Sequence, residues 1–156
     1  MLKIDIPGRR ELHLRWLISD YNGTLARDGA LLPEVIPLIR SLSAQLQFHI
    51  VTADTFGLAA KALGGLPVKL TILPPDHQDQ RKLEYVRQFR ADFVVCLGNG
   101  RNDRLMLREA ALGICVMEAE GTCVQTLQEA DVVSRSAKDA LELLLNPKRL
   151  IASLRT

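Results

Sequence analysis

Short apolar runs alternate with helically spaced apolar positions along most of the chain. Runs of this length that are rich in β-branched residues predict buried strands. The segments between them carry apolar residues three and four apart, which predicts helices with one buried face. Such alternation is typical of a parallel sheet covered by helices on both faces. The predicted strands lie at residues 15–19, 48–51, 68–73, 93–97, 113–117 and 131–134.

The remaining segments complete a three-layer, doubly wound α/β fold that is Rossmann-like. An N-terminal β-hairpin over residues 2–14 precedes the first strand, and residues 27–32 form a small turn and a short flap. No insertion is large enough to form a cap domain, so we expect one domain over residues 1–156. A first helix is predicted from Pro33 toward residue 46, and a second one ends at residue 63. Further helices are predicted at 81–90, 102–110, 122–130 and 136–145, and a last one after Pro147.

Composition narrows the function classes. The chain has 156 residues, of which 47% are hydrophobic, and a net charge of +2. That charge is too small to indicate nucleic-acid binding, and no apolar run is long enough to span a membrane. The charged N-terminus does not resemble a signal peptide. The three cysteines, Cys96, Cys115 and Cys123, form no CxxC pair, which predicts reduced, buried thiols and a cytoplasmic protein.

Polar side chains gather where three predicted strands end. Asp20 follows the first strand and is followed by Asn22, Gly23 and Thr24, while Thr52 follows the second strand. A glycine-rich loop at residues 98–103 follows the fourth strand. Because ligands of open α/β sheets bind at the carboxyl ends of the strands, we expect these groups to share one crevice.

These residue types are suited to phosphoryl chemistry. Carboxylates hold Mg²⁺, which prefers oxygen ligands. A hydroxyl and a lysine, here Thr52 and Lys82, hold phosphoryl oxygens. A carboxylate such as Asp20 can attack phosphorus and form an aspartyl-phosphate.

The order of these motifs resembles that of the haloacid dehalogenase (HAD) superfamily. That family's first motif is D-x-D-G-T, its second a Thr or Ser, its third a Lys, and its fourth resembles G-D-G-x-N-D. The four motifs correspond here to residues 20–24, Thr52, Lys82 and residues 98–103. The resemblance covers residues 15–135, and it implies a capless, Mg²⁺-dependent phosphatase.

Within that family, the pattern looks most like the phosphorylation domain of P-type ATPases in soluble form. That variant has Thr-Gly-Asp as its second motif, and here the residues are Thr52, Ala53 and Asp54. It also places a neutral residue two positions after the nucleophile, as Asn22 does.

The resemblance implies a role for each matching residue. Asp20 is the nucleophile and a metal ligand, and Asn22 offers its backbone carbonyl to the metal. Thr52 and Lys82 hold the phosphoryl group, and Asn99 and Asp103 complete the metal site. The substrate-binding loops then contain Gly23, Thr24, Thr52, Ala53, Lys82 and Asn102.

Two positions depart from the family pattern. Phosphatases of the family use an Asp at the position of Asn22 as general acid and base, and an amide cannot relay a proton. The loss of such a group costs roughly 10²–10⁴ in rate. Asn99 stands where the family has a metal-binding Asp, which predicts weaker Mg²⁺ affinity.

Structural alternatives stand beside these interpretations. Thr52, Asp54 and Thr55 are also good helix caps, and for Asp54 capping or loop bracing is favoured over metal contact. Lys82 could be an ordinary solvated lysine. Tyr21 could contact substrate at the mouth of the crevice or be structural, and His49 is predicted to lie in the core or at its edge.

The sequence therefore leaves competing functions open. The first is hydrolysis of an unidentified phosphorylated substrate, and the alternative is a weakened phosphate- or phosphoprotein-binding module. Between them lies a phosphoryl-transfer protein with a long-lived aspartyl-phosphate. A receiver domain fits less well, because its phosphorylated Asp lies on a strand in the middle of the chain order and is preceded by an acidic pair. Here the Asp20 strand comes first among the sheet strands and is followed by Gly23 and Thr24. An uncapped crevice also predicts either a large substrate or a homo-oligomer whose neighbouring subunit covers the site.

Overall fold

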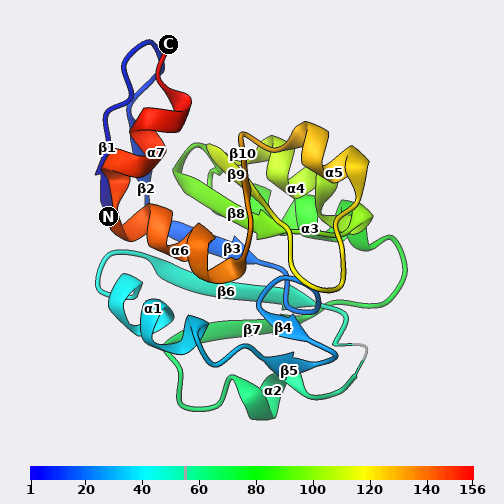
Figure 1. Cartoon of the computed structure of the whole chain (residues 1–156). Helices are drawn as coiled ribbons and strands as arrows, with labels where there is room; N and C mark the ends of the chain where they lie inside the picture. Colours follow the sequence, from blue (N-terminus) through cyan, green and yellow to red (C-terminus); the bar gives the residue numbers. More distant parts are fainter. Residues whose placement is uncertain (55) are drawn as a thin grey trace.

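A computed structural model describes residues 1–54 and 56–156 of the chain (Figure 1). Its strands and helices alternate as the sequence pattern predicts. The strands are β1 (Leu2–Ile4), β2 (Leu12–Leu14), β3 (Trp16–Ser19), β4 (Ala26–Arg27), β5 (Ala30–Leu31), β6 (Gln47–Thr52), β7 (Val68–Ile72), β8 (Val94–Gly98), β9 (Leu112–Val116) and β10 (Val132–Ser134). The α-helices are α1 (Val35–Leu42), α2 (Ala59–Ala62), α3 (Gln78–Arg87), α4 (Arg104–Glu109), α5 (Val124–Glu129), α6 (Ala137–Leu145) and α7 (Pro147–Leu154), with 3-10 turns at Ala91–Phe93 and Arg101–Asp103.

Six parallel strands form the central sheet, in the order β10-β9-β8-β3-β6-β7. The strand β3 lies in the middle, and its Leu17 pairs with Phe48 on one side and Val95 on the other. Both faces of β3 are covered, which explains why its sequence is apolar without alternation. The predicted α/β fold is therefore confirmed, and its sheet is wholly parallel.

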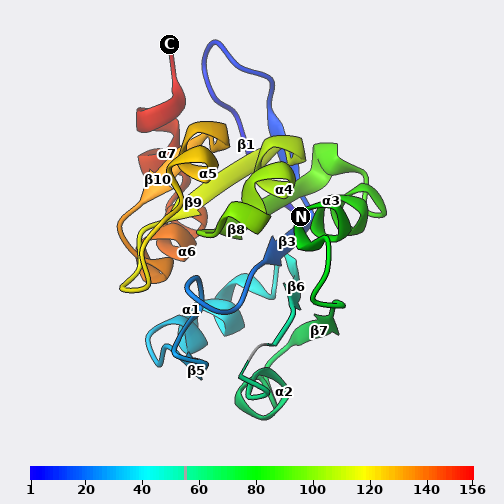
Figure 2. The same ribbon diagram turned by 90° about the vertical axis from the view of Figure 1, so that its right-hand side faces the viewer.

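Helices cover the two faces of this sheet (Figures 1 and 2). One core joins α1, α6 and α7 to one face, together with the N-terminal hairpin. A second core joins α3, α4 and α5 to the other face. The two cores share the strands between them, so the sheet edge that carries the strand ends is held from both sides.

Two antiparallel hairpins accompany the sheet. The pair β1–β2 confirms the predicted N-terminal hairpin, and β4–β5 forms the predicted flap, defined here as residues 26–31. Tyr21 is fully buried, and its hydroxyl donates a hydrogen bond of 3.0 Å to the Gly29 carbonyl. Of the two alternatives for Tyr21, the structure supports the structural role, because the side chain points inward and anchors the flap.

Several predicted boundaries and environments shift. The helix α3 begins at Gln78 rather than residue 81, because the polar residues before it form its first turn. Cys96 and Cys115 are buried as predicted, whereas Cys123 is only half-buried at the start of α5. His49 is buried, and its Nδ1 lies 2.9 Å from the Tyr85 hydroxyl, as expected for a core histidine. Among the described residues, no helix has the length and apolarity needed to cross a bilayer.

The central position of β3 predicts a large stability cost for truncating it. Leu17 has no exposed surface, so Leu17→Ala should lower the free energy of unfolding by about 3 kcal/mol through lost burial and a residual cavity. Val133 on the edge strand β10 is 43% exposed, and Val133→Ala should cost less than about 1 kcal/mol. Urea denaturation of both variants measures this, and equal losses would contradict a core centred on β3.

Candidate active site

Three adjacent strands deliver the candidate residues to one edge of the sheet. Asp20 is the first residue after β3, Thr52 is the last residue of β6, and Gly98 is the last residue of β8. The backbone N–H of Asp20 donates to the Leu97 carbonyl at 3.0 Å, which continues the pairing of β3 with β8 for one more residue. Because β8, β3 and β6 are neighbours in the sheet, their carboxyl ends meet at one edge, as the sequence predicts.

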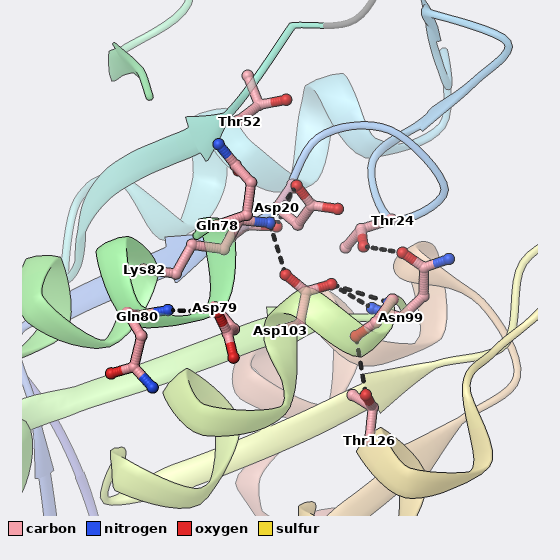
Figure 3. Close-up of polar contacts among 12 residues, drawn as sticks. Asp20, Thr24, Thr52, Gln78, Asp79, Gln80, Lys82, Asn99, Asp103 and Thr126 are labelled. Atoms are coloured by element: carbon pink, nitrogen blue, oxygen red, sulfur yellow. Dashed lines mark hydrogen bonds and ion pairs between the residues drawn. The ribbon is translucent and has the colours of Figure 1, made fainter. Parts of the chain in front are cut away.

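A buried lysine joins two of the predicted residues (Figure 3). The Nζ of Lys82, on α3, lies 2.8 Å from Oδ1 of Asp20 and 2.7 Å from Oδ1 of Asp103. Lys82 has no exposed surface, so it is not the ordinary solvated lysine that was the alternative. The second oxygen of Asp20 points away from Lys82.

The charges in this triad shift one another's proton affinity. Burial raises the pKa of Asp20, the nearby Asp103 raises it further, and Lys82 only partly offsets them, so that the pKa is about 6. Burial opposes the charged form of Lys82, but Asp103 and Asp20 outweigh it and raise the Lys82 pKa above its ordinary value. At neutral pH Asp20 is therefore mainly ionised and lies beside a lysine cation.

The glycine-rich loop is organised by the Asp103 carboxylate. Its Oδ2 accepts hydrogen bonds from the backbone N–H groups of Asn99 and Gly100, both at 2.9 Å. A Cβ at Gly98 would lie 2.5 Å from the Asp103 Cβ, so only glycine permits this close approach. Asp103 consequently uses one oxygen for the lysine and the other for its own loop.

Asn99 connects this loop to the loop after β3. Its Oδ1 accepts a hydrogen bond of 3.1 Å from the Thr24 hydroxyl, and its Nδ2 donates to the Gly121 carbonyl at 2.9 Å. Gly23 has a φ of +76°, and a Cβ there would lie 2.5 Å from Asn99 Nδ2. Thr24 and Gly23 therefore contact Asn99 and support the site. Both the oxygen and the nitrogen of the Asn99 amide already have hydrogen-bond partners within the protein.

The loop after β6 is braced by its own side chains. The Thr52 hydroxyl accepts the backbone N–H of Asp54 at 3.0 Å. Oδ1 of Asp54 accepts the N–H groups of Leu58 and Ala59, each at 3.1 Å. Asp54 thus acts as the loop brace that its sequence position favoured, and its φ of +49° turns the chain toward α2. Thr55, the other candidate cap, lies outside the described residues.

These loops enclose a small hollow of about 170 Å³, which we call the Asp20 hollow. Of the predicted site residues, Lys82, Asp103, Gly23 and Thr24 lie outside its lining and support it. Gly100 contributes to the lining although it was not singled out from the sequence. The lining consists of Asp20, Asn22, Thr52, Ala53, Asn99, Gly100 and Asn102.

The donor set of the Asp20 hollow suits a cation that prefers oxygen and keeps much of its water. Oδ1 of Asn22 is buried without a hydrogen-bond partner among the described residues, so the site leaves an oxygen acceptor unused. Asp20, which lines the hollow, supplies a carboxylate. Among the described residues no group of three or more His, Cys, Asp and Glu side chains could hold a metal. Mg²⁺ bound by few protein ligands and by substrate oxygens fits this set.

Two polar side chains near the site escaped the sequence reasoning. Thr126 on α5 donates its hydroxyl to the Gly100 carbonyl at 2.8 Å and so fixes the glycine-rich loop. Gln78 lies four residues before Lys82 on α3, and residues with that spacing share one helix face. Helical periodicity around Lys82 could have identified Gln78, whereas Thr126 had no sequence signal.

Sequence comparison finds one informative relative. No family model matches the chain. The uncharacterized protein MJ0073 of Methanocaldococcus jannaschii is 47% identical over 62 residues, which are 40% of this chain and 67% of that protein. The chain belongs to the same family as MJ0073.

Solved structures reveal the wider fold group. A 3-deoxy-D-manno-octulosonate 8-phosphate phosphatase from Moraxella catarrhalis superposes with a TM-score of 0.71 at 17% identity, over 92% of this chain and 94% of the other. The cobalt-bound phosphatase YrbI of Haemophilus influenzae gives 0.71 at 13% identity, with the same two coverages. A Legionella pneumophila structure assigned to HAD superfamily subfamily III A gives 0.72 at 15% identity, over 90% and 87%. The described residues thus form a HAD fold without a cap domain.

The raised pKa of Asp20 predicts a pH-dependent stability cost. The folded-state pKa of about 6 exceeds the ordinary 3.8, so the folded state binds this proton more tightly than the unfolded chain does. Asp20 therefore destabilises the fold fully above pH 6, and the cost disappears as the pH falls toward about 4. In metal-free buffer, Asp20→Asn should raise the free energy of unfolding at pH 8 by about 1–3 kcal/mol.

Denaturation of both proteins at pH 8 and pH 4.5 tests this expectation. The difference between variant and wild type should shrink at the lower pH. Asp5→Asn, at an exposed position in the hairpin, serves as the control and should show no such trend. A stabilisation that is absent at pH 8, or equal at both pH values, would contradict the raised pKa.

Proposed function

We propose that this chain is a divalent-metal-dependent phosphohydrolase that acts through an aspartyl-phosphate on Asp20. The buried ion pairs of Lys82 with Asp20 and Asp103 carry the proposal. These ion pairs hold the Asp20 carboxylate at the edge of the sheet where β3, β6 and β8 end. Lys82 holds one oxygen of Asp20, and the other oxygen is directed away from the lysine. A structural ion pair alone would not need the adjoining polar hollow and its unpartnered Asn22 oxygen.

The chain's own groups support two chemical steps. An oxygen of Asp20 attacks the phosphorus, the P–O bond to the leaving group breaks, and an acyl phosphate forms on Asp20. Water then attacks that phosphorus and releases inorganic phosphate with the Asp20 carboxylate restored. Lys82 favours the anionic form of Asp20, and Thr52, at the rim of the hollow, offers its hydroxyl to the phosphoryl oxygens. When bound, Mg²⁺ supplies positive charge that offsets the charge of the phosphoryl group.

The ligands bound in similar solved structures support the phosphate and metal assignments. The Moraxella phosphatase was crystallised with magnesium, phosphate and a KDO molecule, and the Haemophilus protein with cobalt. At 17% and 13% identity these proteins support the reaction class and not a particular substrate. We further propose that Asn22 makes the second step slow, because an amide cannot take the proton from the attacking water.

A substitution at Asp20 tests the nucleophile. Wild-type protein with Mg²⁺ should release p-nitrophenol from p-nitrophenyl phosphate, and Asp20→Asn should reduce this rate to background because the amide cannot form the acyl phosphate. Asp5→Asn, the same change at an exposed position, should retain the wild-type rate. Equal rates in wild type and Asp20→Asn would show that Asp20 is not the nucleophile.

A substitution at Asn22 tests the cause of slow turnover. Asn22→Asp restores a general base, so the aspartyl-phosphate should disappear roughly 10²–10⁴ times faster. The measurement is the decay of labelled phosphate trapped on the protein by acid quenching. Asn146→Asp makes the same chemical change at the exposed end of α6 and should leave the decay unchanged. An unaltered lifetime in Asn22→Asp would remove Asn22 as the limiting residue.

A binding module is the second candidate, and Asn22 and Asn99 favour it. Asn22 cannot relay a proton, and the amide of Asn99 is occupied by Thr24 and Gly121. On this hypothesis the chain binds phosphate or vanadate, but a broad panel of phosphomonoesters shows no Asp20-dependent turnover. Sustained turnover of any panel member would exclude it.

A further inference from the structure

A second hollow lies beside the Asp20 hollow. It measures about 410 Å³, and we call it the Arg101 hollow. Asn102 lines both hollows, so the two adjoin at this side chain. A ligand whose phosphoryl group occupies the first would extend its remainder into the second. The lining consists of His77, Gln78, Asp79, Arg101 and Asn102.

The lining of the Arg101 hollow contains one guanidinium group, that of Arg101, and one carboxylate, that of Asp79. Arg101 is exposed, and among the described residues it forms no ion pair. By contrast, the nearby Arg81 is held by Asp76 at 2.9 Å. The carboxylate of Asp79 accepts the backbone N–H of Gln80 at 2.9 Å and thus faces its own helix. Arg101 is therefore the guanidinium of this lining that is available to a ligand, and the Asp79 carboxylate in the same lining would oppose a bound anion.

Gln78 supplies a second sign that a ligand belongs here. Its Nε2 donates to the Pro74 carbonyl, while its Oε1 is buried without a partner among the described residues. A buried acceptor without a donor costs free energy unless a bound molecule satisfies it. Gln78 precedes Lys82 by one helical turn, and Figure 3 shows the two on the same side of α3. Gln78 therefore lines the Arg101 hollow from the side of α3 that also carries Lys82.

We propose that the Arg101 hollow binds the leaving-group part of the substrate and that Arg101 recognises a second anionic group on it. The identity of the Asp20 hollow as the phosphoryl site rests on the proposed function. The substrate class is then a small phosphomonoester with a carboxylate or a second phosphate at its far end. The hollow is lined entirely by polar residues and contains no Phe, Tyr or Trp ring, so a stacked nucleobase fits it poorly.

Non-hydrolysable phosphonates test this proposal without turnover. Calorimetry with Mg²⁺ compares propylphosphonate with 3-phosphonopropionate and propane-1,3-bisphosphonate, and repeats the set with one more carbon in the chain. A charge-assisted hydrogen bond to Arg101 should make the doubly anionic ligands bind about tenfold tighter than the alkyl ligand. The carboxylate and bisphosphonate arms then distinguish the two kinds of second anion.

Three variants assign the effect to the hollow. Arg101→Gln should reduce the advantage of the second anion to about twofold or less. Arg104→Gln removes the same charge three residues later, outside the lining, and should retain most of the advantage. Asp79→Asn removes the opposing charge and should increase the advantage about twofold. Thermal unfolding of each variant verifies that it is folded.

The outcomes separate this proposal from the proposed function. The proposal would be overturned if the doubly anionic ligands bound less than twofold tighter than the alkyl ligand at both chain lengths. It would also be overturned if their tighter binding persisted in Arg101→Gln, or if Arg104→Gln reduced it equally. Failure of the doubly anionic ligands to bind at all would do the same. If the advantage depends on Arg101 but p-nitrophenyl phosphate is not hydrolysed, the anion site stands and the hydrolase assignment falls. If p-nitrophenyl phosphate is hydrolysed but the second anion does not tighten binding, the hydrolase assignment stands and the anion site falls.

Discussion

The buried ammonium of Lys82 is the interaction on which the site depends. Lys82 has no exposed surface, and an ammonium removed from water is stable only when it is paired and hydrogen-bonded. One carboxylate partner, Asp20, follows the carboxyl end of β3, and the other, Asp103, lies in the turn that follows β8. Lys82 itself lies on α3. One charge therefore fixes the distance between three elements that are far apart in sequence. Removing it would leave two carboxylates facing one another in a buried space.

The other hydrogen bonds of the site extend this constraint outward. Asp103 gives its second oxygen to the glycine-rich loop, and Thr126 holds the same loop from α5. Asn99 then ties that loop to Thr24 and to Gly121. The walls of the Asp20 hollow are consequently set by bonds within the protein. The acceptor oxygen of Asn22 stands apart from this network, because it is buried and has no hydrogen-bond partner among the described residues.

Much of this arrangement could be predicted from the sequence because burial leaves a pattern. Strands covered on both faces are continuous apolar runs, so β3, β6 and β8 and the polar residues that follow them were recognisable. Side-chain direction in turns leaves no such pattern. Tyr21 follows Asp20 directly, yet it points into the core toward Gly29, and the carboxylate of Asp54 turns back to accept hydrogen bonds from its own loop. The partners of Asn99 come from two loops distant in sequence, which periodicity cannot reveal.

The two asparagines change the balance between binding and chemistry in the Asp20 hollow. Lys82 is paired with both Asp20 and Asp103, so the triad has one ammonium group for two carboxyl groups. Carboxylates at positions 22 and 99 would add negative charge, and an incoming phosphate would meet stronger repulsion. The amides remove this repulsion, but Asn22 also removes the proton acceptor that water attack requires. On the proposed function, with Arg101 in the adjoining hollow, the site would favour the binding of an anion over the release of its phosphoryl group. The slow step is therefore expected after Asp20 has been phosphorylated, where a long-lived aspartyl-phosphate would accumulate.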